Sequence, residues 1–340
     1  MTALTTEAVA TEIAKRRPRM LAAALRLQER FPVLQLAIAV AAFIVGATTL
    51  DGFARPTSIV SVLVLASLVA LAGMGQTLVV LIGGFDMSVA SFLVVGAVAV
   101  TQLPATFGIP VGVSVLLLIP FTLVLGAFVG WVCHRFKIEP LIVTLAMGTF
   151  ALGLVQVPTE GMIAGGAPEW LLALTSLRST TFGLPFPPIL AIWLLLTIAM
   201  GVFIHRTVAG RRLQATGANA RAASYALIRV RRVWILVFAA SALMASLAGI
   251  ALASFSGTVN TAIGGPYLFQ SLAAVIIGGT AFGGPGDYTR TVVGAVMLTI
   301  ITTVLIGHGL ATSDQQILYG LVILLAMVIY GRGRRLADRV

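Results

Sequence analysis

The sequence consists largely of apolar runs that are long enough to cross a lipid bilayer as helices. Crossing the hydrocarbon core takes about 20 apolar residues, and such runs recur along the 340 residues, separated by short polar or Gly/Pro breaks. Hydrophobic residues make up 59% of the chain and charged residues 10%, whereas a typical soluble domain carries about 25% charged residues. A soluble core cannot bury such an excess. We therefore expect an all-α, polytopic membrane protein.

Ten segments qualify as membrane helices, and we expect some of them to be broken or re-entrant. The first run is too long for the core of a signal peptide and lacks a clear cleavage site, so we interpret it as a retained helix. The expected organisation is a basic N-terminal segment over 1–31, a transmembrane domain over 32–330 and a tail over 331–340. The ten segments are 32–50, 57–82, 88–103, 109–133, 141–157, 188–205, 233–255, 267–280, 291–306 and 316–330.

The distribution of basic residues predicts which ends of these helices face the cytoplasm. Lys and Arg near helix ends stay on the cytoplasmic side. With both termini inside, all of the 22 basic residues except Arg55 and Arg178 lie on that side, including those of the segment 206–232. The thirty-residue loop at about 158–187 then faces outward, and its stretch WLLALTSL (170–177) is typical of a short interfacial helix.

Two apolar runs end in paired glycines followed by an acid: VVLIGGFDMS over 79–88 and AVIIGGTAFGGPGD over 274–287. Glycine-interrupted segments in corresponding halves of a transporter often mark the broken helices that line its pathway. Glycine is also common in membrane helices for a simpler reason, since it lets backbones pack closely. Both interpretations stay open. The glycines expected to have a structural role are Gly83, Gly84, Gly278, Gly279, Gly283 and Gly284.

The sequence offers no machinery for covalent catalysis. A P-loop needs Gly-Lys-Ser/Thr to hold phosphates, and the only lysines, Lys15 and Lys137, follow Ala14 and Phe136. The three histidines lie at different helix ends without metal-ligand spacing, and no G-x-S-x-G motif is present. The net charge of +11 lies between apolar runs rather than on one polar face, which argues against nucleic acid as a partner. We expect no catalytic residue, metal or cofactor in this chain.

Asp86 is the only acid deep in apolar sequence, and it has two interpretations. A carboxylate at a helix break could line a polar path and accept hydrogen bonds from solute hydroxyls. Alternatively, the order Asp86, Met87, Ser88 suits a helix N-cap, where a side-chain oxygen satisfies free N–H groups that are costly in lipid. The two roles are compatible, and the capping role is favoured. Asp86, Ser88 and Asn260 are the polar groups that we expect near a solute pathway.

The stretch GRRLQATGANARAASYALIRVRRVW (210–234) is the most informative polar segment. Gly217 permits a sharp turn, and Asn219 can cap a helix. The run 220–226 would then form a short helix with a smooth face of Ala222, Ala223 and Ala226. Such a helix could fit closely into a groove of a partner protein; it could also be a solvated connection without any partner.

Four stretches together resemble the permease subunits of ribose, xylose, arabinose and galactose importers, within a superfamily that includes branched-chain amino-acid permeases. GMGQTLVVLIGGFDMSVAS (73–91) is similar to the family's G-x-T-x-V-x-x-x-G-G-x-D-L-S-V-G-S segment, and EPLIVTLAMGTF (139–150) resembles its P-F-I-x-T-L stretch. GRRLQATGANARAA (210–223) is similar to its cytoplasmic loop, and SLAAVIIGGTAFGGPGD (271–287) resembles a later glycine-rich segment. The matches follow the family's order over most of the chain. Three positions depart from the family pattern: Ala220, Leu227 and Arg290, where an acid, a glycine and a small or apolar residue are usual.

The resemblance implies a permease domain over 32–330 in an ATP-binding cassette importer of the bacterial inner membrane. Its partners would be a second permease copy, identical or related, an external solute-binding protein, and a cytoplasmic ATPase that carries ATP and Mg. The coupling element would include Gly210, Gly217, Asn219, Ala222 and Ala223. A monosaccharide is the expected solute. The alternatives are a permease for branched-chain amino acids or nucleosides, and a carrier that works without ATP.

Overall fold

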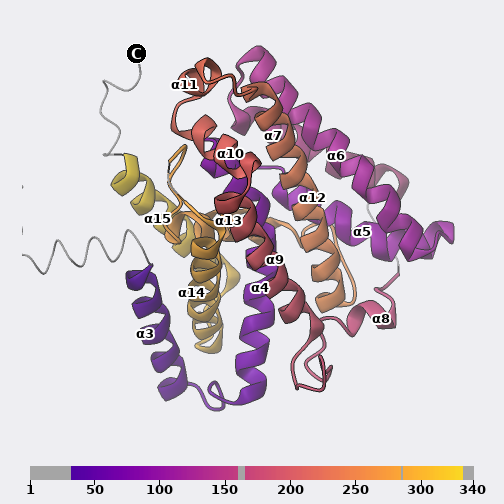
Figure 1. Cartoon of the computed structure of the whole chain (residues 1–340). Helices are drawn as coiled ribbons and strands as arrows, with labels where there is room; N and C mark the ends of the chain where they lie inside the picture. The colour runs from indigo at the N-terminus through magenta and orange to yellow at the C-terminus, as the bar shows by residue number, and fades with distance from the viewer. Residues whose placement is uncertain (1–31, 160–164, 285, 332–340) are drawn as a thin grey trace, which may run out of the picture.

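The computed structural model describes residues 32–159, 165–284 and 286–331, and within these ranges the chain is helical apart from connecting loops (Figure 1). The predicted all-α class is therefore confirmed. The expected segment 1–31 and residues 332–340 of the tail lie outside the described residues. The helices are α3 (Val33–Thr49), α4 (Pro56–Leu81), α5 (Val89–Phe107), α6 (Val111–Phe136), α7 (Pro140–Thr159), α8 (Glu169–Leu172), α9 (Pro188–Arg206), α10 (Val208–Ala218), α11 (Ala220–Tyr225), α12 (Val230–Ser256), α13 (Gly265–Ile277), α14 (Tyr288–Gly307) and α15 (Thr312–Gly331).

Each of the ten expected membrane segments contains a helix, with ends that shift by a few residues. Among the described residues, seven helices are long and apolar enough to cross a bilayer: α4, α5, α6, α7, α9, α12 and α14. Helix α13 has 13 residues and is about 20 Å long at 1.5 Å per residue. It is too short for a hydrocarbon core of about 30 Å, which confirms that one of the expected segments is broken.

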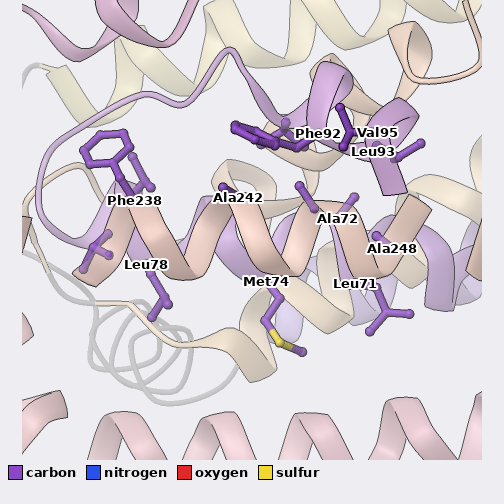
Figure 2. Packing of buried hydrophobic residues seen from close by; sticks show 14 of the residues in the cluster. Leu71, Ala72, Met74, Leu78, Phe92, Leu93, Val95, Phe238, Ala242 and Ala248 are labelled. Atoms are coloured by element: carbon purple, nitrogen blue, oxygen red, sulfur yellow. The ribbon is translucent and has the colours of Figure 1, made fainter. Parts of the chain in front are cut away.

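Helices α4 and α12 form the centre of the bundle. Every residue of α4 from Ala66 to Leu81 is buried, and α12 packs against α4, α5 and α6. Figure 2 shows side chains of α4, α5 and α12 in one apolar cluster, among them Met74, Phe92 and Phe238. Because lipid is as apolar as these side chains, the helices associate through close van der Waals packing rather than through the hydrophobic effect.

Small residues bring α12 close to its neighbours. A Cβ added at Gly96 of α5 would lie 1.9 Å from the carbonyl oxygen of Ser246, and one at Gly126 of α6 would lie 2.4 Å from that of Phe238. Neither position can hold a larger residue without moving a helix backbone. Helices α6 and α9, by contrast, expose leucines and other large apolar side chains on their outer faces, as lipid-facing helices do.

The short helices mark the two ends of the bundle. Helices α10 and α11 lie at one end, while α8 and the loop between α3 and α4 lie at the opposite end (Figure 1). Arg55 belongs to that loop and Arg178 follows α8, so the two basic residues predicted to be external share one end. The expected interfacial helix over 170–177 is shorter than predicted, because α8 ends at Leu172.

Candidate functional site

The two glycine-rich runs form the same kind of helix ending. At the end of α4, the N–H of Gly83 donates to the carbonyl of Val80 and the N–H of Gly84 donates to that of Val79, both at 2.9 Å. At the end of α13, Gly279 and Thr280 donate in the same way to Ile276 and Val275, at 2.9 and 3.2 Å. This pair of bonds defines a Schellman ending, which needs a left-handed residue. Gly83 and Gly279 supply it, with φ of +83° and +96°.

The two endings also lie against each other. The N–H of Gly283 donates to the carbonyl of Val80 at 2.9 Å, and the rings of Phe85 and Phe282 are 4.5 Å apart between centroids. Gly83 and Gly279 occupy the same position in the two endings. The interpretation of the two runs as related elements is supported by these shared bonds.

The remaining glycines of these runs differ in how tightly they are packed. A Cβ on Gly278 would lie 2.3 Å from the carbonyl oxygen of Arg290, so α13 and α14 meet there at backbone distance. Gly283 is constrained by its backbone instead, because its φ of +57° lies in the left-handed region that favours glycine. A Cβ on Gly84 or Gly284 would stay at least 3.0 Å from its nearest neighbour, so these two positions constrain the backbone less than Gly278 does.

Asp86 follows the α4 ending and is enclosed by hydroxyl and backbone donors. Its Oδ1 accepts hydrogen bonds from the Ser88 N–H at 2.9 Å and from the Ser88 hydroxyl, and its Oδ2 accepts one from the Ser241 hydroxyl of α12 at 2.6 Å. The side chain is 1% exposed. Both carboxylate oxygens are thus satisfied by the protein, as buried polar groups require.

This arrangement gives Asp86 a structural role, although the predicted role of helix N-cap is wrong because Asp86 accepts no hydrogen bond from the first turn of α5. Ser88 stands at the N-cap of α5 but makes no capping bond with its own side chain; Asp86 accepts from the Ser88 N–H instead. The neighbouring N–H of Met87 donates to the Thr144 hydroxyl of α7 at 3.0 Å. The loop after α4 is therefore held by α5, α7 and α12 together. A contact between Asp86 and a solute stays a prediction.

Ser241, the partner of Asp86 across the bundle, was not predicted from the sequence. The close approach of α4 and α12 was not predicted either: a Cβ on Gly75 of α4 would lie 2.6 Å from the Cα of Ser241. Small residues at four-residue spacing, Ser241, Ala245 and Gly249, are a usual signal of a packed membrane interface. This spacing in α12 could have predicted from the sequence that the Ser241 face packs closely against another helix.

Asn260 belongs to the loop after α12, where its side chain is exposed and accepts a hydrogen bond from the N–H of Ala262 at 3.0 Å. The same loop returns to the start of α5, because a Cβ on Gly264 would lie 2.2 Å from the carbonyl oxygen of Ala90. A position of Asp86, Ser88 and Asn260 beside a solute pathway stays a prediction.

Helix α10 reaches the end of α4 through Gly217. A Cβ on Gly217 would lie 1.9 Å from the carbonyl oxygen of Leu81, the last residue of α4. The prediction of a sharp turn at Gly217 is wrong, because this residue lies within α10 and the chain turns at Asn219. At the other end of α10, Gly210 packs on the last turn of α9 and its N–H donates to the Thr207 hydroxyl at 3.0 Å.

Helix α11 begins at the predicted cap. The Asn219 Oδ1 accepts a hydrogen bond from the N–H of Ala222 at 3.0 Å, which confirms Asn219 as an N-cap. The smooth alanine face is only partly free, however. Ala222 and Ala226 are exposed, but Ala223 is 4% exposed and packs against its own chain. The expectation that Ala222 and Ala223 share one outward face is therefore wrong.

The most exposed apolar side chains near α11 are Tyr225 and Leu227, at 87% and 90%. Leu227 has a φ of +60°, a left-handed conformation that glycine adopts freely and a branched residue adopts only under strain. This position is the one where the resembled loops carry glycine. The departure noted in the sequence thus has a visible backbone consequence.

A family model described as "Branched-chain amino acid transport system / permease component" matches residues 58–328. The chain belongs to this permease family. The match includes α4 to α14 and most of α15, and with it both glycine endings, Asp86 and the α10–α11 segment. The prediction of a transporter subunit rather than an enzyme is thereby confirmed, as is the multi-pass membrane class.

Curated relatives cover the permease almost end to end. A ribose import permease of Bacillus subtilis is 30% identical over 82% of this chain and 85% of its own. A ribose import permease of Escherichia coli is 29% identical over 89% and 94%, respectively. A permease of an autoinducer 2 import system from Photorhabdus laumondii is 29% identical over 85% and 89%. No solved structure matches the chain.

Proposed function

We propose that this permease is the membrane-spanning subunit of an ATP-driven importer for a monosaccharide or a similarly hydroxylated small solute. Its relatives include ribose and autoinducer 2 import permeases, and the sequence motifs resemble those of sugar permeases. Since the chain contains no P-loop, ATP and Mg bind a separate cytoplasmic ATPase. An external binding protein delivers the solute, and a second permease copy completes the pathway in the inner membrane.

The contact between α10 and α4 carries this proposal. Gly217 lies against the last carbonyl of α4 at backbone distance, and the loop directly after it holds Gly83 and Asp86. A displacement of α10 by an ATPase would therefore move the end of α4, and with it the hydrogen bonds that Asp86 accepts from Ser88 and from Ser241 of α12. This contact is a direct structural route from α10 to the centre of the bundle.

The exposed side of the α10–α11 segment supports its role as the coupling element. Ala222, Tyr225 and Leu227 are exposed there, whereas Gly210, Gly217 and Ala223 pack inward on the permease itself. We therefore assign contact with the ATPase to the first three residues and transmission within the permease to the others.

Uptake by intact cells identifies the solute class. Cells that express the permease with its ATPase and binding protein should accumulate labelled ribose, and unlabelled ribose should compete at low concentration. The family description favours branched-chain amino acids as the second candidate. Competition by leucine and not by ribose would replace the sugar assignment with that candidate, while uptake that survives loss of the ATPase would exclude an ATP-driven importer.

A further inference from the structure

A cavity of about 560 Å³ opens beside the first turns of α12, and of its lining residues only Leu227, at its rim, has a role assigned above. It lies between α12, α10, the end of α9 and the last turns of α4. Three arginines line it, Arg212 from α10 and Arg229 and Arg232 from the start of α12, and none of its lining residues is acidic. The other walls are apolar: Leu78, Phe203, Leu213, Val233, Leu236, Val237 and Ala240 among them.

The lining residues of α12 change from basic to apolar with depth. Arg229, Arg232, Leu236 and Ala240 recur at helical spacing on one face, and the stripe is about 16 Å long at 1.5 Å per residue. The arginines mark its outer end, where the membrane helices end, and Leu236, which is 67% exposed, lies about 6 Å beyond Arg232 along the helix axis. A ligand that fits this gradient has an anionic head and a hydrocarbon tail.

The charges of these arginines are not neutralised within the described part of the chain. The ion pair between described residues in this region joins His205 to Asp287 at 3.1 Å, and Asp287, which also accepts from Thr289, does not line the cavity. Arg229 and Arg232 moreover stand at the N-terminal turn of α12, where the helix dipole already favours an anion. Binding an anion there offsets both sources of positive potential.

The positive-inside rule accounts for arginines at this end of the bundle but not for their gathering around a cavity. Arg221 and Arg231 occupy the same end and are equally exposed, yet neither lines it. We infer that the cavity is a binding site for an anionic phospholipid, with the phosphate held by Arg212, Arg229 and Arg232 and an acyl chain lying along Leu236. Basic pockets between helices at the cytoplasmic face bind such headgroups in other membrane proteins.

Native mass spectrometry of the delipidated, full-length permease tests the site, with phosphatidylglycerol and phosphatidylcholine as probes. Phosphatidylglycerol should bind at least tenfold more tightly than phosphatidylcholine.

The double variant Arg229→Gln/Arg232→Gln should bind phosphatidylglycerol about 30-fold more weakly than the parent, since each juxtamembrane charge contributes about a fivefold gain in affinity. The matched double variant Arg221→Gln/Arg231→Gln removes the same charge from outside the cavity and should change binding less than twofold. All four arginines are exposed, so both variants should keep the elution volume and melting temperature of the parent.

Three results would overturn the assignment. Equal weakening in the two double variants would mean diffuse surface attraction, and equal binding of the two lipids would mean that no headgroup is recognised. Glycerol phosphate has the phosphate of the headgroup but no acyl chains, so a hundredfold excess of it should not displace phosphatidylglycerol. Full displacement by glycerol phosphate would show a site for a free phosphate instead.

Discussion

Which side chains a position in this permease tolerates depends on the hydrogen-bond donors around it and on its backbone conformation. Asp86 is buried with three donors on its carboxylate, and Leu227 is exposed in a backbone conformation that suits glycine. The first position tolerates only side chains that accept hydrogen bonds, whereas the second would accept a smaller residue readily. Both positions therefore allow predictions with opposite signs.

Replacing Asp86 separates its structural from its functional role. In Asp86→Ala the Ser88 N–H and the Ser241 hydroxyl lose their buried acceptor, which should cost about 1–3 kcal/mol of stability. Asp86→Asn keeps an acceptor for the Ser88 N–H and should stay folded with near-normal uptake. Thermal unfolding in detergent and uptake assays measure the two effects. A stable Ala variant would contradict the structural role, and a folded but inactive Asn variant would establish a role for the charge.

Leu227→Gly should stabilise the α10–α11 segment. A branched residue in the left-handed region costs about 1–3 kcal/mol, and the greater freedom of glycine in the unfolded chain takes back about 0.5–1 kcal/mol, so a gain near 1 kcal/mol is expected. Tyr225→Gly is the control, since Tyr225 is equally exposed but ends α11 with ordinary φ; it should destabilise. Hydrogen exchange of the α11 amides measures the stability of this helix in both variants. Faster exchange in Leu227→Gly would contradict the inferred backbone strain at Leu227.

Helices were predictable because the apolar length of a membrane helix is encoded locally. Each of the ten segments contains a helix for that reason, although among the described residues only seven are long and apolar enough to cross a bilayer. The cap at Asn219 was predictable because a capping side chain bonds to backbone a few residues away. Contacts between helices were not predictable from one sequence: Asp86 meets Ser241, and Gly217 meets Leu81, over separations of more than a hundred residues. Ala223 turned inward because α11 packs against α12, and helical spacing alone does not tell which side of a short helix is covered.

The contact between α10 and α4 predicts a specific uncoupling variant. A side chain at position 217 cannot fit beside the Leu81 carbonyl, so Gly217→Val should displace α10 at a cost of about 1–3 kcal/mol. The variant should reach the membrane and bind its partners, but ATP hydrolysis should no longer drive uptake.

Gly201→Ala is the matched control for that variant, because a Cβ at this position of α9 meets only a side-chain carbon at 3.9 Å. It should transport like the parent. Uptake and ATPase activity measured together decide the matter, and normal coupling in Gly217→Val would remove α10 from the proposed route.

At the scale of the whole molecule, α10 and α11 lie at one end of the bundle, and α8 and the loop between α3 and α4 lie at the other. This arrangement predicts the orientation of the protein in the membrane. In intact cells, a membrane-impermeant maleimide should label Phe182→Cys, whose position is 95% exposed in the loop between α8 and α9. Ala220→Cys in α11 should react only after permeabilisation. The native Cys133 is buried and should contribute little background. The reverse labelling pattern would invert the proposed topology.

Uptake by proteoliposomes that contain the purified permease, its ATPase and its binding protein tests most directly whether this permease belongs to an ATP-driven sugar importer. Labelled ribose should accumulate inside only when all three proteins and ATP with Mg are present. Gly217→Val should abolish this accumulation while leaving the complex assembled. Ribose that equilibrates through the permease alone, without ATPase or nucleotide, would show that transport is not driven by ATP.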